Sequence, residues 1–368
     1  MSNFLEPLLH DLAERFRFLD EELARIQAPP EAGPCRQQIQ RLVSRGKARI
    51  DSVLTDPDIA RPDFAKNFYH TFKRLSELAQ AVEEGPLFAL SRFRLEDRFL
   101  TRVVGAVCQE FAFPYTAPIC AAMSSQYYFA MPGMDLILVP HGEATHLLGW
   151  ADLYHELGHF ILARNRAGLL QPLRRRVSNH FLSAVHDATR QGWTPDAVEE
   201  LNTYRGLWLG DWILEFACDW FATFAVGPSF AWSNLRLCAR MSTDLFGIAR
   251  THPADAARTQ AIIEMLRLIA GHASMHQVES QWQELLGTVG TREPQYFRIA
   301  YPPALIRELA TEASQLFKSS GFQSHNPGSK PIADLLTEAW KRFQANPAGF
   351  SQWESGQLQQ LRKEFNLI

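Results

Sequence analysis

The sequence predicts a mainly α-helical protein with a small β-sheet, an α+β fold. Two observations support this prediction. Long segments toward both ends repeat apolar side chains with the period of a helix that buries one face. Between them, residues 117–141 form three short runs, rich in aromatic and branched side chains and interrupted by Pro and Gly, which is typical of strands and turns.

The first third of the chain predicts a bundle of helices. Apolar residues from Leu5 to Ile26 fall on one face of a helical repeat, and Pro29 and Pro30 end the run. The same period predicts further helices over residues 39–53, 64–82 and 95–111, the second of which stops near Gly85-Pro86.

The rest of the chain combines the predicted strands with further helices. A helix over residues 151–164 follows the strands, Thr194-Pro195 is a cap and first turn for a helix to Leu207, and Gly227-Pro228 ends an apolar helix. Later helical runs cover residues 262–269, 278–286, 305–317, 332–343 and 358–365. We expect an N-terminal bundle over 1–95, a core over 96–270 and a C-terminal helical region over 271–368.

Composition and charge argue against several classes of partner and location. The formal net charge of -3 and the lack of a polybasic tract give no indication of nucleic acid. Five scattered cysteines without a CxxC pair favour buried thiols, and the N-terminus lacks a secretory pattern, so we expect a cytoplasmic protein. The uncharged stretch from Phe111 to Met134 contains prolines and polar residues, which predicts strands and turns rather than a membrane span.

The motif "HELGH", residues 155–159, carries the strongest chemical signal. On a helix, His155 and His159 lie one turn apart on one face and can bind one zinc ion together. Glu156 lies at the edge of that face, where a carboxylate can act as general base toward a zinc-bound water. The alternative is a coincidental surface helix, but the neighbouring residues are apolar, so this polar triplet is expected to be buried or to line a cleft.

A second stretch, "GDWILEFACDWFATFAVGP", contains candidates for the third zinc ligand, which the two histidines do not provide. Catalytic zinc usually takes three protein ligands, and Glu215 and Asp219 share one face of this apolar helix. Burying two carboxylates one turn apart is costly unless a cation compensates. We predict Glu215 as third ligand and Asp219 as the acceptor that orients His155. The alternative is a carboxylate pair that faces solvent or bonds arginines such as Arg205.

These motifs together resemble the gluzincin zinc metallopeptidases. HELGH followed downstream by Glu-x-x-x-Asp, with this separation, is similar to the HtpX-like and CAAX prenyl protease type, over roughly residues 115–265. The resemblance implies a zincin-like core with helical flanks, one zinc ion per chain, and a substrate strand paired with a sheet edge near Tyr127 to Val139. Those relatives are often membrane-embedded, and this chain departs from them in that respect.

Two further residues, in "THPADAARTQAI", have two interpretations. This segment is similar to the His-Pro and Arg of the same type, which implies that His252 or Arg258 helps to stabilise an oxyanion. Alternatively, His252-Pro253 caps the following helix and Arg258 pairs with an acid.

The expected activity is hydrolysis of a peptide bond in a protein or peptide substrate. Zinc would lower the pKa of its water toward about 7, and Glu156 would take the proton as the water attacks the carbonyl. Three alternatives stay open: a helical scaffold that keeps a zinc site and binds a partner, a latent protease that a regulatory protein opens through the helical flanks, and a hydrolase of non-peptide amides. Glu156 argues against the scaffold, because a structural zinc site needs no base.

Overall fold

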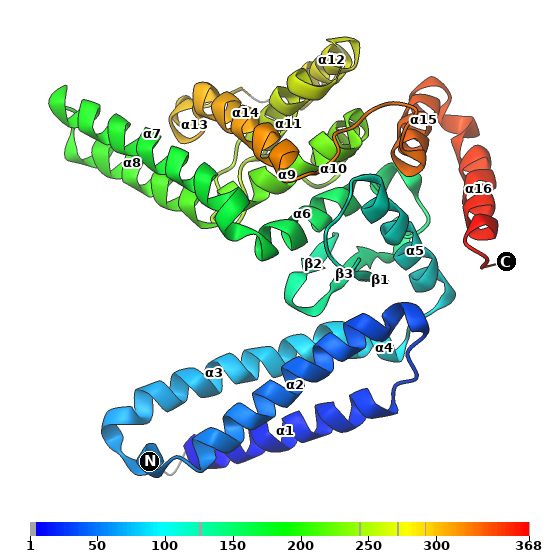
Figure 1. The fold of residues 1–368 in the computed structure, drawn as a ribbon. Coiled ribbons are helices and arrows are strands. Elements are labelled where there is room, and N and C mark those ends of the chain that lie inside the picture. Colours follow the sequence, from blue (N-terminus) through cyan, green and yellow to red (C-terminus); the bar gives the residue numbers. More distant parts are fainter. Residues whose placement is uncertain (1–4, 125–126, 243, 271, 291, 368) are drawn as a thin grey trace. The chain divides into compact units, whose positions relative to one another are not determined.

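The computed structural model describes residues 5–124, 127–242, 244–270, 272–290 and 292–367 (Figure 1). Most of these residues lie in helices, and three short strands form a single small sheet, as the sequence predicts. Among the described helices, none combines the length and the apolar character needed to cross a membrane.

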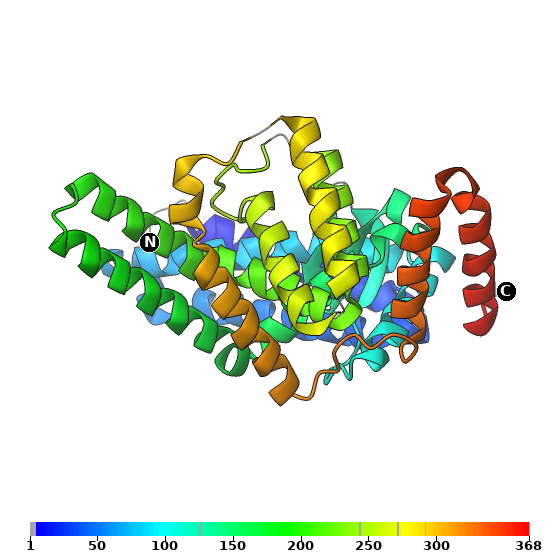
Figure 2. The ribbon, with the colours of Figure 1, turned by 90° about the horizontal axis from the view of Figure 1, so that it is seen from above.

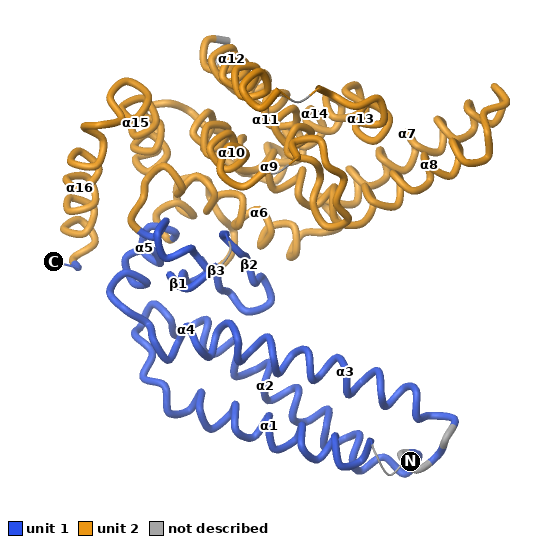
Figure 3. Tube along the Cα trace, turned by 180° about the vertical axis from the view of Figure 1, so that it is seen from behind, with its two compact units in different colours: residues 1–104, 116–144, 367 blue, residues 105–115, 145–366, 368 orange. Residues whose placement is uncertain are grey.

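The chain divides into two compact units (Figure 3). Unit 1 contains residues 1–104 and 116–144 together with Leu367, and unit 2 contains residues 105–115 and 145–366. The division expected at residues 95 and 270 stays a prediction.

Unit 1 combines the predicted helical bundle with the sheet. Its helices are α1 (Leu5–Arg25), α2 (Gly33–Leu54), α3 (Ala65–Val82), α4 (Phe88–Ser91) and the first part of α5 (Leu95–Glu110). Apolar faces of α1, α2 and α3 share one core with strand residues such as Ile119 and Leu136. Gly46 permits the contact between α1 and α2, because a Cβ there would lie 2.2 Å from the Phe16 ring.

The sheet has one closed edge and one open edge. Strands β1 (Ile119–Ser124), β3 (Leu136–Pro140) and β2 (Phe129–Met131) lie in that order, with β1 parallel and β2 antiparallel to β3. On the outer side of β1, the backbone N–H groups of Cys120 and Ala122 donate to Thr101 Oγ1 at 3.0 Å and to Asp97 Oδ1 at 2.7 Å. The outer side of β2 pairs with no other described strand, so the edge expected near Tyr127 to Val139 exists. Residues 125 and 126, within the predicted strands, lie outside the described part.

Unit 2 is helical. Its elements are α6 (Asp152–Arg164), α7 (Gln171–Arg190), α8 (Pro195–Leu207), η9 (Trp208–Trp212), α9 (Ile213–Val226), α10 (Pro228–Met241), α11 (Asp255–Ile269), α12 (His272–Val289), α13 (Gln295–Ala300), α14 (Pro303–Ser319), α15 (Pro331–Ala345) and α16 (Pro347–Glu364). Helices α7 and α8 form an antiparallel hairpin (Figure 2). Thr194 caps α8 as predicted, since its side chain accepts from the Ala197 N–H.

Candidate metal centre

The candidate centre is built on two helices, α6 and α9, that pack directly against each other. Gly158 makes this close packing possible, because a Cβ at this position would lie 3.1 Å from Cys218 Cα. A glycine in a helix interior costs about 1 kcal/mol relative to alanine, and here the contact between the two helices explains its presence. The predicted polar triplet is largely buried: His155 is 7% and Glu156 6% exposed.

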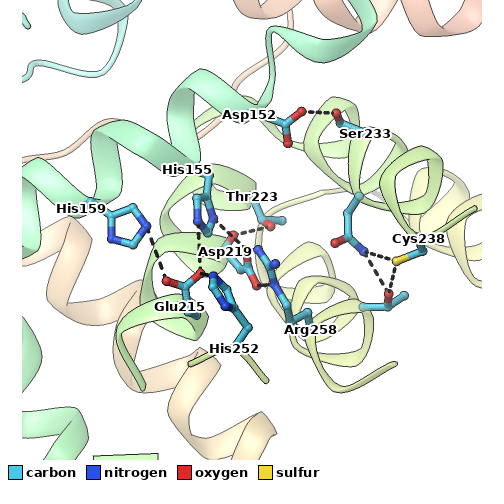
Figure 4. A network of polar contacts seen from close by, with 12 residues as sticks. Asp152, His155, His159, Glu215, Asp219, Thr223, Ser233, Cys238, His252 and Arg258 are labelled. Carbon is cyan, nitrogen blue, oxygen red and sulfur yellow. Dashed lines mark hydrogen bonds and ion pairs between the residues drawn. The ribbon is translucent and has the colours of Figure 1, made fainter. Parts of the chain in front are cut away.

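Three predicted ligands converge at this contact (Figure 4). His155 Nε2 lies 3.5 Å from Glu215 Oε2, and His159 Nε2 lies 3.7 Å from Glu215 Oε1. Two donors that each lie about 2.1 Å from one tetrahedral zinc ion are roughly 3.4 Å apart. The spacing of nitrogen and oxygen donors therefore fits a zinc ion held by His155, His159 and Glu215.

Asp219 takes the position that the sequence predicts for it. The carboxylate is fully buried, and its Oδ1 lies 2.9 Å from the other ring nitrogen of His155, Nδ1. Such a contact fixes the orientation of a liganding imidazole and leaves Nε2 free to face the metal. The predicted pairing of the two motifs thus exists in the folded chain.

Arg258 also binds Asp219, which the sequence left open. Its Nε donates to Oδ2 at 2.8 Å and its Nη2 donates to Oδ1 at 2.7 Å, a bidentate ion pair. The guanidinium therefore supplies part of the positive charge that a buried pair of carboxylates requires. Arg205, the partner considered from the sequence, instead donates to Ser178.

The charged groups within the centre hold one another in their ionised forms. Burial opposes ionisation of Asp219 and Glu215, but Arg258 and His155 respectively outweigh it and keep the pKa of each carboxyl below its ordinary value. Burial and the nearby His155 lower the pKa of His159 to about 4. Burial opposes protonation of His155, yet Asp219 and Glu215 raise its pKa to about 10. At neutral pH the centre thus presents two carboxylates, a neutral His159 and a protonated His155, which must lose its proton before it can bind a metal.

Cys218 is a nearby group that sequence analysis missed. Donor atoms of His155, His159 and Cys218 all lie within 4.8 Å of one another. Complete burial raises the pKa of the thiol well above its ordinary value, so it remains protonated, whereas Glu215 is ionised and faces both imidazole Nε2 atoms. Glu215 is therefore the better third ligand. The clue to Cys218 was its position one turn from Glu215 on the same helix.

Helix α10 supports the centre from outside, a role that sequence reasoning missed. Phe230 stacks on His155, with ring centroids 6.0 Å apart and an interplanar angle of 16°. Ser233 donates to Asp152 Oδ2, at the start of α6, over 2.6 Å. These contacts connect α10 to the helix that carries both histidines.

His252 approaches the centre from the segment between α10 and α11. Its Nε2 lies 3.9 Å from Glu215 Oε2, and its side chain is 61% exposed. The cap of α11 is Ala254, so His252 does not cap this helix. Of the two interpretations of "THPADAARTQAI", the structure therefore places His252 beside the ligands and pairs Arg258 with an acid.

No model of a known protein family, no curated protein and no solved structure matches the chain. The resemblance to gluzincin metallopeptidases therefore stays a prediction that depends on the two motifs and on the geometry described above.

Proposed function

We propose that the chain is a zinc-dependent metallopeptidase that cleaves peptide bonds in a protein or peptide substrate. One observation supports this proposal above all. The Nε2 atoms of His155 and His159 face the two oxygens of one carboxylate, Glu215, at distances expected for ligands of a single tetrahedral ion. A buried acceptor, Asp219, holds the remaining nitrogen of His155.

Each polar residue then has a separate task. When bound, zinc supplies a Lewis acid that lowers the pKa of water to about 7 and polarises a carbonyl oxygen. Glu156 follows the first ligand directly and is buried on the same helix. It takes the proton of the attacking water and returns it to the leaving nitrogen of the peptide.

His252 is our candidate for stabilising the oxyanion. Its ring is exposed and close to Glu215, so it can donate to an oxygen that develops charge at the centre. Arg258 gives Nε and Nη2 to Asp219, and we therefore assign it to orienting Asp219 rather than to contact with substrate. A regulatory partner and a cytoplasmic location stay predictions.

The test uses three variants of the full chain and two measurements on the same samples. Bound zinc and cleavage of a broad peptide library are measured for wild type, Glu156→Gln, Glu215→Ala and the control Glu199→Ala, an exposed glutamate of α8. We expect about one zinc per wild-type chain. Glu156→Gln should keep zinc but lose at least about a hundredfold in kcat. Glu215→Ala should lose zinc and cleavage, and the control should lose neither.

Other results would favour the alternatives. Zinc without peptide cleavage in the wild type would favour the scaffold or the latent protease, and cleavage of only non-peptide amides would favour the third alternative. Absence of zinc from the wild type, after growth and purification with zinc, would refute the proposed site.

A further inference from the structure

The position of the His252 side chain near Glu215 depends on the segment between α10 and α11 that carries it. The His252 side chain is 61% exposed, and its Nδ1 is hydrogen-bonded to the adjacent Thr251 hydroxyl at 3.0 Å. A ring that is exposed to solvent and hydrogen-bonds to the residue beside it in the sequence is not fixed by the packing of surrounding side chains. Apart from this contact with Glu215 at 3.9 Å, the position of the ring depends on the backbone of its own segment.

Two buried side chains hold this backbone on either side of His252. The indole N–H of Trp212 donates to the carbonyl oxygen of Ala249 at 2.8 Å. The hydroxyl oxygen of Tyr301 accepts from the Ala254 N–H at 2.9 Å. The two anchored residues thus bracket His252 within the segment between α10 and α11.

Both anchors are themselves rigid. Trp212 and Tyr301 are fully buried, and their rings stack with centroids 4.7 Å apart and an interplanar angle of 23°. Trp212 is the last residue of η9, and Glu215 follows in the first turn of α9. One continuous stretch of chain therefore sets the position of a predicted metal ligand and, through Ala249, that of the His252 segment.

We infer that Trp212 and Tyr301 are positioning residues, which hold His252 at the metal centre. Groups that stabilise a transition state act best when their orientation is fixed before reaction, so loss of an anchor lowers kcat without removing the metal. The catalytic part of this inference rests on the proposed function. The structural part, that these two side chains hold the segment in place, does not.

The test compares two substitutions by phenylalanine, each of which removes one hydrogen-bonding group, with a matched control. Tyr301→Phe removes the acceptor of the Ala254 N–H, and Trp212→Phe removes the donor to Ala249. The control Trp220→Phe removes a similar indole hydrogen bond, from buried Trp220 to Ala261 of α11. Hydrogen exchange of residues 249–254, bound zinc, kcat and KM are measured for each full-length variant.

We expect both anchor variants to exchange faster over residues 249–254 and to lose roughly tenfold in kcat, with KM and bound zinc unchanged. Trp220→Phe should leave exchange of this segment unchanged. In a His252→Ala background, the anchor substitutions should cause no further loss of kcat, because they act through His252.

Three outcomes would overturn the inference: unchanged exchange in both anchor variants, loss of zinc with the activity, or an equal loss of kcat when His252 is already absent. If the wild type cleaves no peptide, the proposed function fails, and the exchange measurement alone decides whether Trp212 and Tyr301 position the segment. If His252→Ala is fully active, the catalytic part of the inference is refuted.

Discussion

Two carboxylates on one face of α9 have different roles because they have different neighbours. Glu215 faces the Nε2 atoms of His155 and His159, whereas Asp219 binds the opposite nitrogen of His155 and the Arg258 guanidinium. His155 is thus held between two anions, and this raises its pKa to about 10 against the opposing effect of burial. Its ring therefore carries a proton that a metal must displace.

We predict that zinc binding near pH 6 releases about one proton, from His155, because a zinc-bound water with a pKa of about 7 is still largely protonated there. His159, with a pKa of about 4, is already neutral there, so it releases none. Between the His159 pKa of about 4 and the pKa of about 7 of the zinc-bound water, zinc affinity should rise roughly tenfold per pH unit, because His155 stays protonated in the free chain up to its pKa of about 10. Calorimetric titration in buffers with different ionisation enthalpies measures the proton count.

The control for this prediction is Asp219→Asn. Loss of the carboxylate charge lowers the pKa of His155, so at a pH between the lowered value and the wild-type value of about 10 the variant should release fewer protons than the wild type. Zinc binding by the wild type without proton release at pH 7 would contradict the assignment of charge at the centre.

The sequence predicted which residues act together where their spacing along one helix puts them on the same face. Four-residue intervals put His155 with His159, and Glu215 with Asp219, on common helix faces, and their chemistry suggested a metal. Arg258 was not identified as the partner of Asp219, because pairing across 39 residues depends on tertiary structure. The third ligand also required a packing argument, since nothing in the sequence says that α6 meets α9.

At the scale of elements, the centre depends on how closely α6 and α9 approach. Gly158 is the point of contact, and the atoms it faces belong to the backbone and side chain of Cys218. Backbone atoms cannot move aside as the end of a flexible side chain can, so extra volume at this position must separate the two helices. Separation would change the distances from both histidines to Glu215.

We predict that Gly158→Ala weakens zinc binding, although alanine favours a helix by about 1 kcal/mol. An added methyl group in a tight contact typically costs about 1 to 3 kcal/mol, which outweighs that gain. The control is Gly206→Ala on α8, where a Cβ would meet no atom within 4 Å and should stabilise the chain slightly. Zinc affinity and urea unfolding are measured for both. Unchanged zinc affinity in Gly158→Ala would show that α6 and α9 can accommodate a methyl group without separating.

The accuracy of element prediction followed the strength of the periodic signal. The apolar stripes of α1, α2 and α3 and the Pro- and Gly-bounded strands predicted elements that the structure contains. Helix α13 (Gln295–Ala300) is too short to show a period and was not predicted. The loop over residues 319–331 was expected from its turn-forming residues, and it separates α14 from α15.

At the scale of the whole molecule, the C-terminal region is joined to the helices of the centre within unit 2. The His325 N–H donates to the Phe224 carbonyl and Lys330 Nζ donates to the Ala225 carbonyl, both near the end of α9. Glu110 accepts hydrogen bonds from the Ile332 N–H and from the hydroxyl of Tyr154, the residue before His155. Residues 325–332 therefore connect α15 to α9 directly and to α6 through Glu110.

We predict that two C-terminal truncations differ in zinc binding and in stability. A chain ending at Ser319 loses the contacts of His325, Lys330 and Ile332 and should lose zinc and cooperative unfolding. The Phe224 and Ala225 carbonyls lose these donors, and Glu110 keeps the Tyr154 hydroxyl but loses a backbone N–H. A chain ending at Ala345 loses only α16, with the contacts of Glu354 to His146 at 3.0 Å and to the Leu147 N–H at 2.7 Å, and should keep zinc with stability lowered by about 1 to 3 kcal/mol. Bound zinc and thermal unfolding distinguish them. Full zinc occupancy in the shorter chain would contradict this connection.

All five cysteines are free and buried, and this has a practical consequence. Burial raises the thiol pKa of the following residues: Cys35, Cys108, Cys218 and Cys238. Protonated, inaccessible thiols react slowly with alkylating reagents. A cysteine introduced at the 38% exposed Ile248, in the segment that carries His252, would thus be the preferred site for a fluorophore. A single label there would report the movement of this segment in real time, against an almost silent background.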